Sequence, residues 1–160
     1  MARIYISVGT NINRELNLRG AVQDLTQLLG PLQLSSVYES EAVGFVGDAF
    51  YNMVIGADTE LALDAVIALC KQTEDNYGRV RDGIKYCGRS LDLDLLSYDQ
   101  LICSDPVELP RAEILHNAFV LQPLAEIAPD ALHPVLRQSY QQLWQNYQIP
   151  QKLWVIPFQF

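Results

Sequence analysis

Hydrophobic residues in the first half of the chain recur with two different periods, which predict alternating strands and helices. Leu18 and Val22 belong to a stripe with the spacing of one helix face, so a helix is predicted over 14–29, with Asn13 as its N-cap. A second stripe predicts a helix over 61–77. β-Branched and aromatic runs bounded by turn residues predict strands over 3–8, 32–40, 50–57 and 90–98.

The second half of the chain has weaker patterns. Apolar spacing predicts helices over 115–127 and 136–147. The pair Leu101-Ile102 is placed to form a hairpin with the strand before it, and the apolar and aromatic residues 153–160 predict an added edge strand. The sequence therefore predicts two helices and one further strand after the strand over 90–98.

The predicted order β-α-β-β-α-β, with two helices of similar length, indicates an α+β ferredoxin-like sandwich. In this fold one face of an antiparallel sheet is covered by helices, and the other is open to substrates or to the C-terminal helices. No linker-like stretch interrupts the pattern, so residues 1–160 are predicted to form a single domain.

Composition narrows the class of protein. The chain has 160 residues and a net charge of −8, which argues against a general nucleic-acid or anionic-membrane surface. The three cysteines are odd in number and form no CxxC pair, which is typical of a reducing compartment and of neither a disulfide framework nor a zinc site. No apolar run is long enough for a signal peptide or a bilayer span. We expect a cytoplasmic protein, a monomer or weak homodimer, that acts on small molecules.

Candidate chemistry gathers in residues 78–98, GRVRDGIKYCGRSLDLDLLSY. Four of the 11 Lys and Arg residues of the chain fall there, and the carboxylates of Asp92 and Asp94 follow them directly. On a strand these two carboxylates share one face and lie about 6–7 Å apart along it, which suits hard cations that also bind a polyphosphate. Arginine forks bind phosphate oxygens. The pattern predicts a metal-dependent phosphate site, and from it alone a nucleotidyl transferase, a phosphatase or a small-ligand regulatory module remains an alternative.

The same stretch resembles the signature of the 6-hydroxymethyl-7,8-dihydropterin pyrophosphokinase family of folate biosynthesis, a GR.R segment, an aromatic residue and then R..DLD. Further segments match in the family's order: SVGTN, SSVYES, AFYNMV and FVLQPLAEIAPD. The resemblance spans roughly residues 3–136. It implies the ferredoxin-like fold, ATP and two Mg²⁺ ions, and transfer of a pyrophosphoryl group to the pterin hydroxymethyl group with release of AMP.

The resemblance also implies a role for particular residues. Asp92 and Asp94 would hold the metal ions, and Arg79 and Arg89 would clamp the phosphates during catalysis. The remaining implied positions form two sets: for ATP, Lys71, Glu74, Arg81 and Arg111; for the pterin, Ser40, Val43, Phe50, Asn52, Tyr86 and Phe119.

The chain departs from the family pattern after the fourth strand. Where the family reads Pro-His-Tyr or Pro-His-Pro, Pro110 is followed by Arg111 and Ala112, and Asn117 replaces an arginine. Arg111 is a candidate to supply the missing positive charge. These departures leave a non-catalytic paralogue that binds pterin or nucleotide as the alternative to an active enzyme. His116 and His133 do not fall on the family histidine, and we expect structural roles for both.

Overall fold

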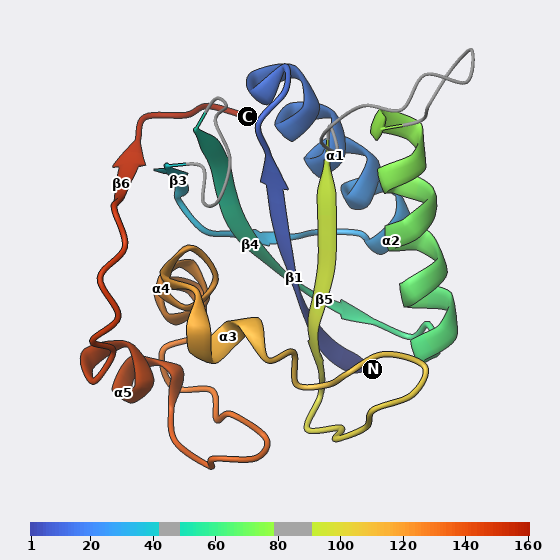
Figure 1. Cartoon of the computed structure of the whole chain (residues 1–160). Coiled ribbons are helices and arrows are strands. Elements are labelled where there is room, and N and C mark those ends of the chain that lie inside the picture. The colour runs from blue at the N-terminus through green and yellow to red at the C-terminus, as the bar shows by residue number, and fades with distance from the viewer. Residues whose placement is uncertain (42–48, 79–90) are drawn as a thin grey trace.

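The structure of the chain is a computed structural model that describes residues 1–41, 49–78 and 91–160. Figure 1 shows a central sheet with helices on both faces. The elements in chain order are β1 (Ala2–Thr10), α1 (Arg14–Leu29), β2 (Gln33–Leu34), β3 (Val37–Ser40), β4 (Phe50–Thr59), α2 (Leu63–Gly78), β5 (Asp92–Tyr98), α3 (Glu113–His116), α4 (Ala118–Ile127), α5 (Tyr140–Gln145) and β6 (Leu153–Ile156).

The strands form one sheet in the order β5-β1-β4-β3-β6, with β2 paired to β4 beside this path. All the pairings in it are antiparallel, and β1 has β4 on one side and β5 on the other. Strands β1 and β5 are thus neighbours although two helices and three strands separate them in sequence. The predicted α+β sandwich, with its antiparallel sheet and packed helices, is confirmed.

The two faces of the sheet are buried by different helices (Figure 1). Successive residues of a strand point to opposite faces. On one face Ile4 and Ile6 of β1 pack in a core that also holds Leu18 of α1. On the other face Tyr5 of β1 packs in a second core with Leu121 of α4. The second face is therefore not open throughout, because the C-terminal helices cover part of it.

Most predicted elements of the first half occur with small shifts at their ends. The helix over 14–29 is α1, and the strand over 50–57 continues to Thr59. The strand over 32–40 is divided into β2 and β3, because Ser36 between them turns its main-chain N–H to the carboxylate of Glu126 (3.0 Å to Oε2). Asn13 is the N-cap residue of α1, as predicted, but its backbone is left-handed (φ 43°) and its side chain makes no capping hydrogen bond. Its main-chain carbonyl accepts the N–H of Asn17 at 2.9 Å.

Three predictions for the second half need correction. The helix over 115–127 is divided at Asn117, whose backbone is extended (φ −116°, ψ 118°). The helix over 136–147 is shorter and begins at Tyr140, because Ser139 closes a capping box with Gln142. The pair Leu101-Ile102 does not join the sheet: a single bridge links Cys103 to Leu109 instead. The predicted edge strand is present as β6, which pairs with β3.

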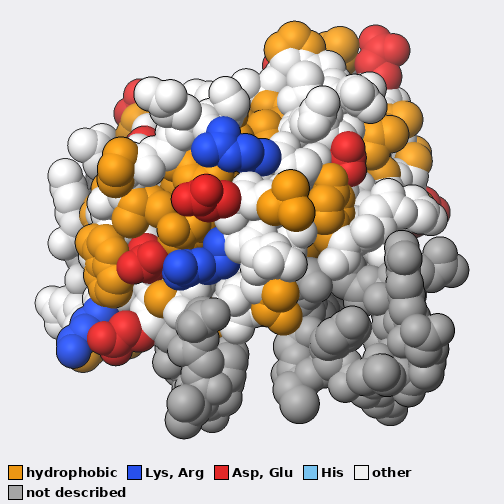
Figure 2. Space-filling view, turned by 90° about the horizontal axis from the view of Figure 1, so that it is seen from above, with side chains coloured by type: hydrophobic (Ala, Val, Ile, Leu, Met, Phe, Trp, Pro, Cys, Tyr) orange, Lys and Arg blue, Asp and Glu red, His pale blue; other side chains and the backbone are white. Residues whose placement is uncertain are grey.

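Figure 2 looks onto the end of the molecule where the C-terminus lies, and it shows Lys and Arg side chains beside Asp and Glu side chains, with hydrophobic side chains among them. Cys70 and Cys103 are free thiols, and Cys87 lies outside the described residues.

No helix in the described part of the chain is both long and apolar enough to cross a bilayer.

Candidate functional site

A cavity of about 300 Å³ opens on the face of the sheet that α4 covers in part. Strands β1, β3, β4 and β5 contribute one side of it, and α3, α4 and the residue between them contribute the other. The residues that line it are Ser7, Gly9, Ser40, Glu41, Phe50, Asn52, Asp92, Asp94, Glu113, Asn117, Phe119 and Val120. The cavity therefore brings together residues that are more than a hundred positions apart in the sequence, from Ser7 to Val120.

Strand register explains why these side chains meet. Gly9 pairs with Asn52 of β4 on one side and with Asp92 of β5 on the other. Directly paired residues of neighbouring strands point to the same face. A Cβ atom at Gly9 would lie 3.4 Å from Oδ1 of Asn52. The absence of a side chain at Gly9 thus leaves open the space between the amide of Asn52 and the carboxylate of Asp92.

A hydrogen bond to Ser40 on the neighbouring strand β3 holds the Asn52 side chain in place. Its Nδ2 donates a hydrogen bond to Oγ of Ser40 at 2.8 Å, and the two residues are only 4% and 6% exposed. This bond orients the amide of Asn52, because the donor end is committed to Ser40. A buried, oriented amide can read the donor and acceptor pattern of a flat heterocycle.

Two phenylalanines line the cavity from opposite sides. Phe50 begins β4, whereas Phe119 belongs to the first turn of α4. Both are partly exposed, in contrast to the fully buried aromatic Tyr140 of the neighbouring core. Aromatic faces at the two walls of a cavity suit a planar ligand.

The carboxylates of Asp92 and Asp94 lie on the cavity side of β5, as the alternating pattern predicts. Leu91, Leu93 and Leu95 point to the opposite face and are buried in the core with α1 and α2. Both aspartates are of intermediate exposure, so their oxygens are accessible from the cavity. Oxygen donors of this type are ligands for Mg²⁺, which usually takes one or two protein carboxylates and completes its shell with water and phosphate.

Arg111 lies beside this carboxylate pair. Its main-chain N–H donates to the carbonyl of Leu96 at 3.0 Å, at the point where β5 has one residue more than β1. Its guanidinium contacts Asp94 (Nη2 to Oδ1, 3.4 Å) and forms two hydrogen bonds with Glu113 (3.0 and 3.2 Å). Burial alone would lower the pKa of Arg111, but the bonds to Glu113 and the charge of Asp94 outweigh it, and the pKa is raised. Arg111 therefore stays a cation at all physiological pH values.

A second cavity of about 180 Å³ adjoins the first, and Asp94 lines both. Lys71 and Glu74 of α2 lie on this second cavity together with Arg111. Glu74 is anchored to β5, because its Oε2 accepts the main-chain N–H of Leu93 at 2.8 Å. Burial, with the charges of Glu74 and Asp94, raises the pKa of the Cys70 thiol there to about 12.

The structure thus sorts the described candidates into two neighbouring groups. The four described candidates for the pterin are on the first cavity, and the three described candidates for ATP, Lys71, Glu74 and Arg111, are on the second. Val43, Arg79, Arg81, Tyr86 and Arg89 lie outside the described residues. Within the described ranges, no group of three or more His, Cys, Asp or Glu side chains is placed to hold a metal ion.

Sequence reasoning did not identify Glu113 or Gly9 as part of this site. Glu113 begins a short helix, where an acidic residue is usual, so its pairing with Arg111 two residues earlier has no distinctive pattern. Gly9 belongs to the matched segment SVGTN, but only the pairing of β1 with both β4 and β5 shows which side chains it separates.

Comparison with known proteins gives a consistent result. The family model for 7,8-dihydro-6-hydroxymethylpterin-pyrophosphokinase matches residues 5–129. The chain is 31% identical to the 2-amino-4-hydroxy-6-hydroxymethyldihydropteridine pyrophosphokinase of Aquifex aeolicus over 86% of its length and 88% of the relative's. It is 36% identical to the enzyme of the same name from Bacillus subtilis, over 77% of this chain and 76% of that one.

Solved structures with the same fold include longer proteins. A Plasmodium falciparum HPPK-DHPS crystal structure aligns with a TM-score of 0.70 over 92% of this chain at 15% identity. The chain spans 44% of that protein, and the likeness concerns the fold alone.

Proposed function

The chain belongs to the 7,8-dihydro-6-hydroxymethylpterin-pyrophosphokinase family, and we propose that it transfers the pyrophosphoryl group of ATP to the hydroxymethyl group of the dihydropterin, releasing AMP. The observation that carries this proposal is the position of Asp94, which lines both an aromatic cavity and a neighbouring cavity with Lys71 and Arg111. A reaction between two substrates needs them side by side, with a group that faces both.

The first cavity is the pterin site. Phe50 and Phe119 take the flat ring between their faces, and the oriented amide of Asn52 bonds to its polar edge. Ser40 fixes that amide. Val43 and Tyr86, which lie outside the described residues, have a role in pterin binding as the family resemblance implies. The pterin ring then lies next to the carboxylate of Asp92, since only Gly9 separates Asp92 from Asn52 across the sheet.

Asp92 and Asp94 would hold the two Mg²⁺ ions that the family resemblance implies. The fit rests on their chemistry: two carboxylates on one strand face line the first cavity, and Asp94 lines the second cavity as well. Bound there, the ions supply charge neutralisation for the phosphates and orient the reacting oxygens.

The second cavity takes the ATP side. Lys71 and Arg111 supply positive charge to the phosphates, while Glu74 holds α2 against β5. Arg79, Arg81 and Arg89 act from the segment after α2, and Arg79 and Arg89 clamp the transferred group. Guanidinium forks suit this role because they bind phosphate oxygens in pairs and neutralise the charge that develops during transfer.

The mechanism needs no covalent enzyme intermediate. The pterin hydroxyl oxygen attacks the β-phosphorus of ATP in line and loses its proton to water. The bond between the β-phosphorus and the oxygen that bridges it to the α-phosphate breaks, and AMP leaves with that oxygen. The protein contributes positioning through Phe50, Asn52 and Phe119 and electrostatic stabilisation through its arginines.

Residues 1–160 act as one catalytic unit, a monomer or weak homodimer in the cytoplasm, with no nucleic-acid or membrane partner.

The test is product analysis of the purified protein with ATP, Mg²⁺ and 6-hydroxymethyl-7,8-dihydropterin. We expect AMP and the pterin diphosphate in equal amounts, and neither when the pterin or Mg²⁺ is omitted. Release of pyrophosphate or free phosphate instead would favour a nucleotidyl transferase or phosphatase. Pterin binding without AMP above the pterin-free control would favour a non-catalytic paralogue.

A further inference from the structure

The last residues of the chain, 147–160, lie beyond the part that matches the family model, yet they contact both walls of the larger cavity. We call this segment the C-terminal strap. It runs from α5, past the junction of α3 and α4, to the free edge of β3, and ends near α1 (Figure 1). Its contacts fall into three groups.

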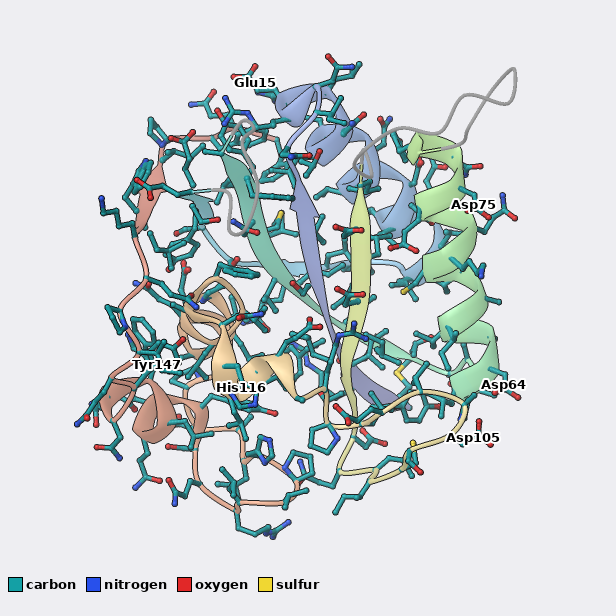
Figure 3. All side chains as sticks on the ribbon, viewed as in Figure 1. Glu15, Asp64, Asp75, Asp105, His116 and Tyr147 are labelled. Carbon is teal, nitrogen blue, oxygen red and sulfur yellow. The ribbon has the colours of Figure 1, made fainter. Side chains whose placement is uncertain are left out.

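The first group holds the wall that carries Phe119. Tyr147 Oη donates to the carbonyl of His116 at 2.6 Å, and Figure 3 shows these two labelled residues next to each other, where α5 meets α3. Gln151 Nε2 donates to the same carbonyl at 3.3 Å, and its Oε1 accepts the main-chain N–H of Ala118 at 2.7 Å. Asn117 makes no side-chain cap for α4, so Gln151 satisfies a first-turn amide one residue before Phe119.

The second group holds the wall that carries Ser40. Strand β6 pairs with β3 in a register that sets Leu153 opposite Ser40. Lys152 Nζ lies 3.6 Å from Oε1 of Glu41, which lines the cavity. Both side chains of that ion pair are well exposed, so the strand pairing contributes more than the ion pair does.

The third group anchors the end of the strap. Phe158 meets the ring of Tyr51 edge-on at 6.2 Å, and the guanidinium of Arg19 from α1 lies 4.6 Å from the Phe158 ring centre. The guanidinium of Arg14 lies over the Tyr51 ring, 4.2 Å from its centre, and donates to the carbonyl of Ala49 at 3.0 Å. Tyr51 lies between Phe50 and Asn52 in β4, so the anchor supports both of these cavity residues.

We infer that the C-terminal strap is a positioning element for the pterin: it fixes the separation of the wall with Phe119 from the wall with Phe50. This inference rests on the proposed function. A flat ring gains full contact with two aromatic faces only at one separation, because dispersion falls steeply with a gap of less than an ångström. The strap joins the two walls through hydrogen bonds at one end and a paired strand at the other. None of these contacts involves Lys71, Glu74 or Arg111 on the ATP side.

The first experiment uses Gln151→Ala, with Gln151→Glu and the exposed Gln148→Ala as comparisons. Loss of both hydrogen bonds should raise KM and Kd for the pterin about fivefold to tenfold. KM for ATP and kcat should change by less than about twofold, since the ATP side keeps its contacts. Gln151→Glu should recover most of the affinity, because a carboxylate still accepts the N–H of Ala118. Gln148→Ala should match the unchanged protein.

A second variant, Phe158→Ala, removes the anchor and leaves Gln151 in place, with exposed Trp154→Ala as its control. It should also weaken pterin binding, measured at equilibrium with a non-hydrolysable ATP analogue, more than it raises KM for ATP. Unchanged pterin affinity in both Gln151→Ala and Phe158→Ala overturns the inference. Equal loss of pterin and ATP affinity overturns it as well, because that indicates general loosening. If the unchanged protein neither binds the pterin nor releases AMP, the proposed function itself is wrong.

Discussion

Arg111 Nη2 lies 3.4 Å from Oδ1 of Asp94, and the two side chains are 31% and 34% exposed. Asp94 lines both cavities, and Arg111 lines the second one. Glu113 accepts hydrogen bonds from Nε and from the same Nη2 of Arg111, at 3.0 and 3.2 Å. Arg111 therefore already neutralises part of the charge of a proposed metal ligand, and a metal ion at Asp94 has to compete with it or share it.

Replacing Arg111 should change metal and nucleotide binding in opposite directions. In Arg111→Ala, Mg²⁺ or Mn²⁺ without nucleotide should bind about threefold to tenfold more tightly, because a cation near Asp94 is gone. KM for ATP should rise about tenfold, because a phosphate contact is lost. Calorimetry measures the affinity for the metal ion, and steady-state kinetics measures KM for ATP. The variant Arg137→Gln, at an exposed arginine, is the control. Weaker metal binding in Arg111→Ala would contradict this role.

The two carboxylates should not be equivalent. Asp94→Asn should lower kcat at least about a hundredfold, which corresponds to roughly 3 kcal/mol of transition-state stabilisation, because Asp94 faces both cavities. Asp92 faces only the larger cavity, so Asp92→Asn should lower kcat by a somewhat smaller factor. The thermal midpoint should stay within a few degrees of that of Asp75→Asn, an exposed carboxylate of α2 (Figure 3). Turnover by Asp94→Asn near the unchanged level would exclude Asp94 as a metal ligand.

Glu126 should be a main contributor to the stability of the cavity walls. Its carboxylate accepts hydrogen bonds from the hydroxyl of Tyr38 at 2.8 Å and from Oγ of Ser36 at 2.7 Å, and so ties α4 to β3. Tyr38→Phe should lower the free energy of unfolding by about 1.5–3 kcal/mol, the range for a bond to a charged group. Urea denaturation measures it, and Tyr98→Phe, whose hydroxyl bonds to a carbonyl near the surface, should cost less. If Tyr38→Phe costs clearly less in the Glu126→Gln background than in the unchanged protein, the two groups are coupled as described. An equal cost in both backgrounds, which is full additivity, would contradict it.

His133 should make stability depend on pH. The His133 side chain is buried, with 3% of the residue exposed, and this burial lowers its pKa from the ordinary 6.5. Its Nδ1 accepts hydrogen bonds from the N–H groups of Val135 and Leu136. Above about pH 6.5 both folded and unfolded chains hold it neutral. Below that value the unfolded chain takes up a proton first, so the free energy of unfolding falls with pH until the folded pKa is reached.

The measurement compares urea denaturation of the unchanged protein and His133→Asn between pH 7.5 and 5. An asparagine oxygen can accept the same N–H groups but does not titrate. The unchanged protein should lose stability more steeply, by at most about 1.4 kcal/mol per pH unit for one proton. Parallel curves for the two proteins would show that His133 does not contribute.

The sequence by itself determined the elements with strong periodicity. The stripe of Leu18 and Val22 specified α1, and the alternation of leucine and aspartate in β5 specified which side chains face the core and which face the cavity. These features depend on contacts between residues close in sequence, where the period alone decides the outcome. The matched segments also indicated the family before any comparison.

Only the tertiary structure decided features that depend on partners far along the chain. The interruption at Asn117 cannot be read from its neighbours, because the α4 amide beside it is satisfied by Gln151, 33 positions after Ala118. The pairing of β1 with both β4 and β5 decides that Gly9 separates Asn52 from Asp92. The sequence thus predicted the candidate residues of the site, whereas the sheet register decided which of the described candidates lie together, because long-range pairing leaves no local pattern.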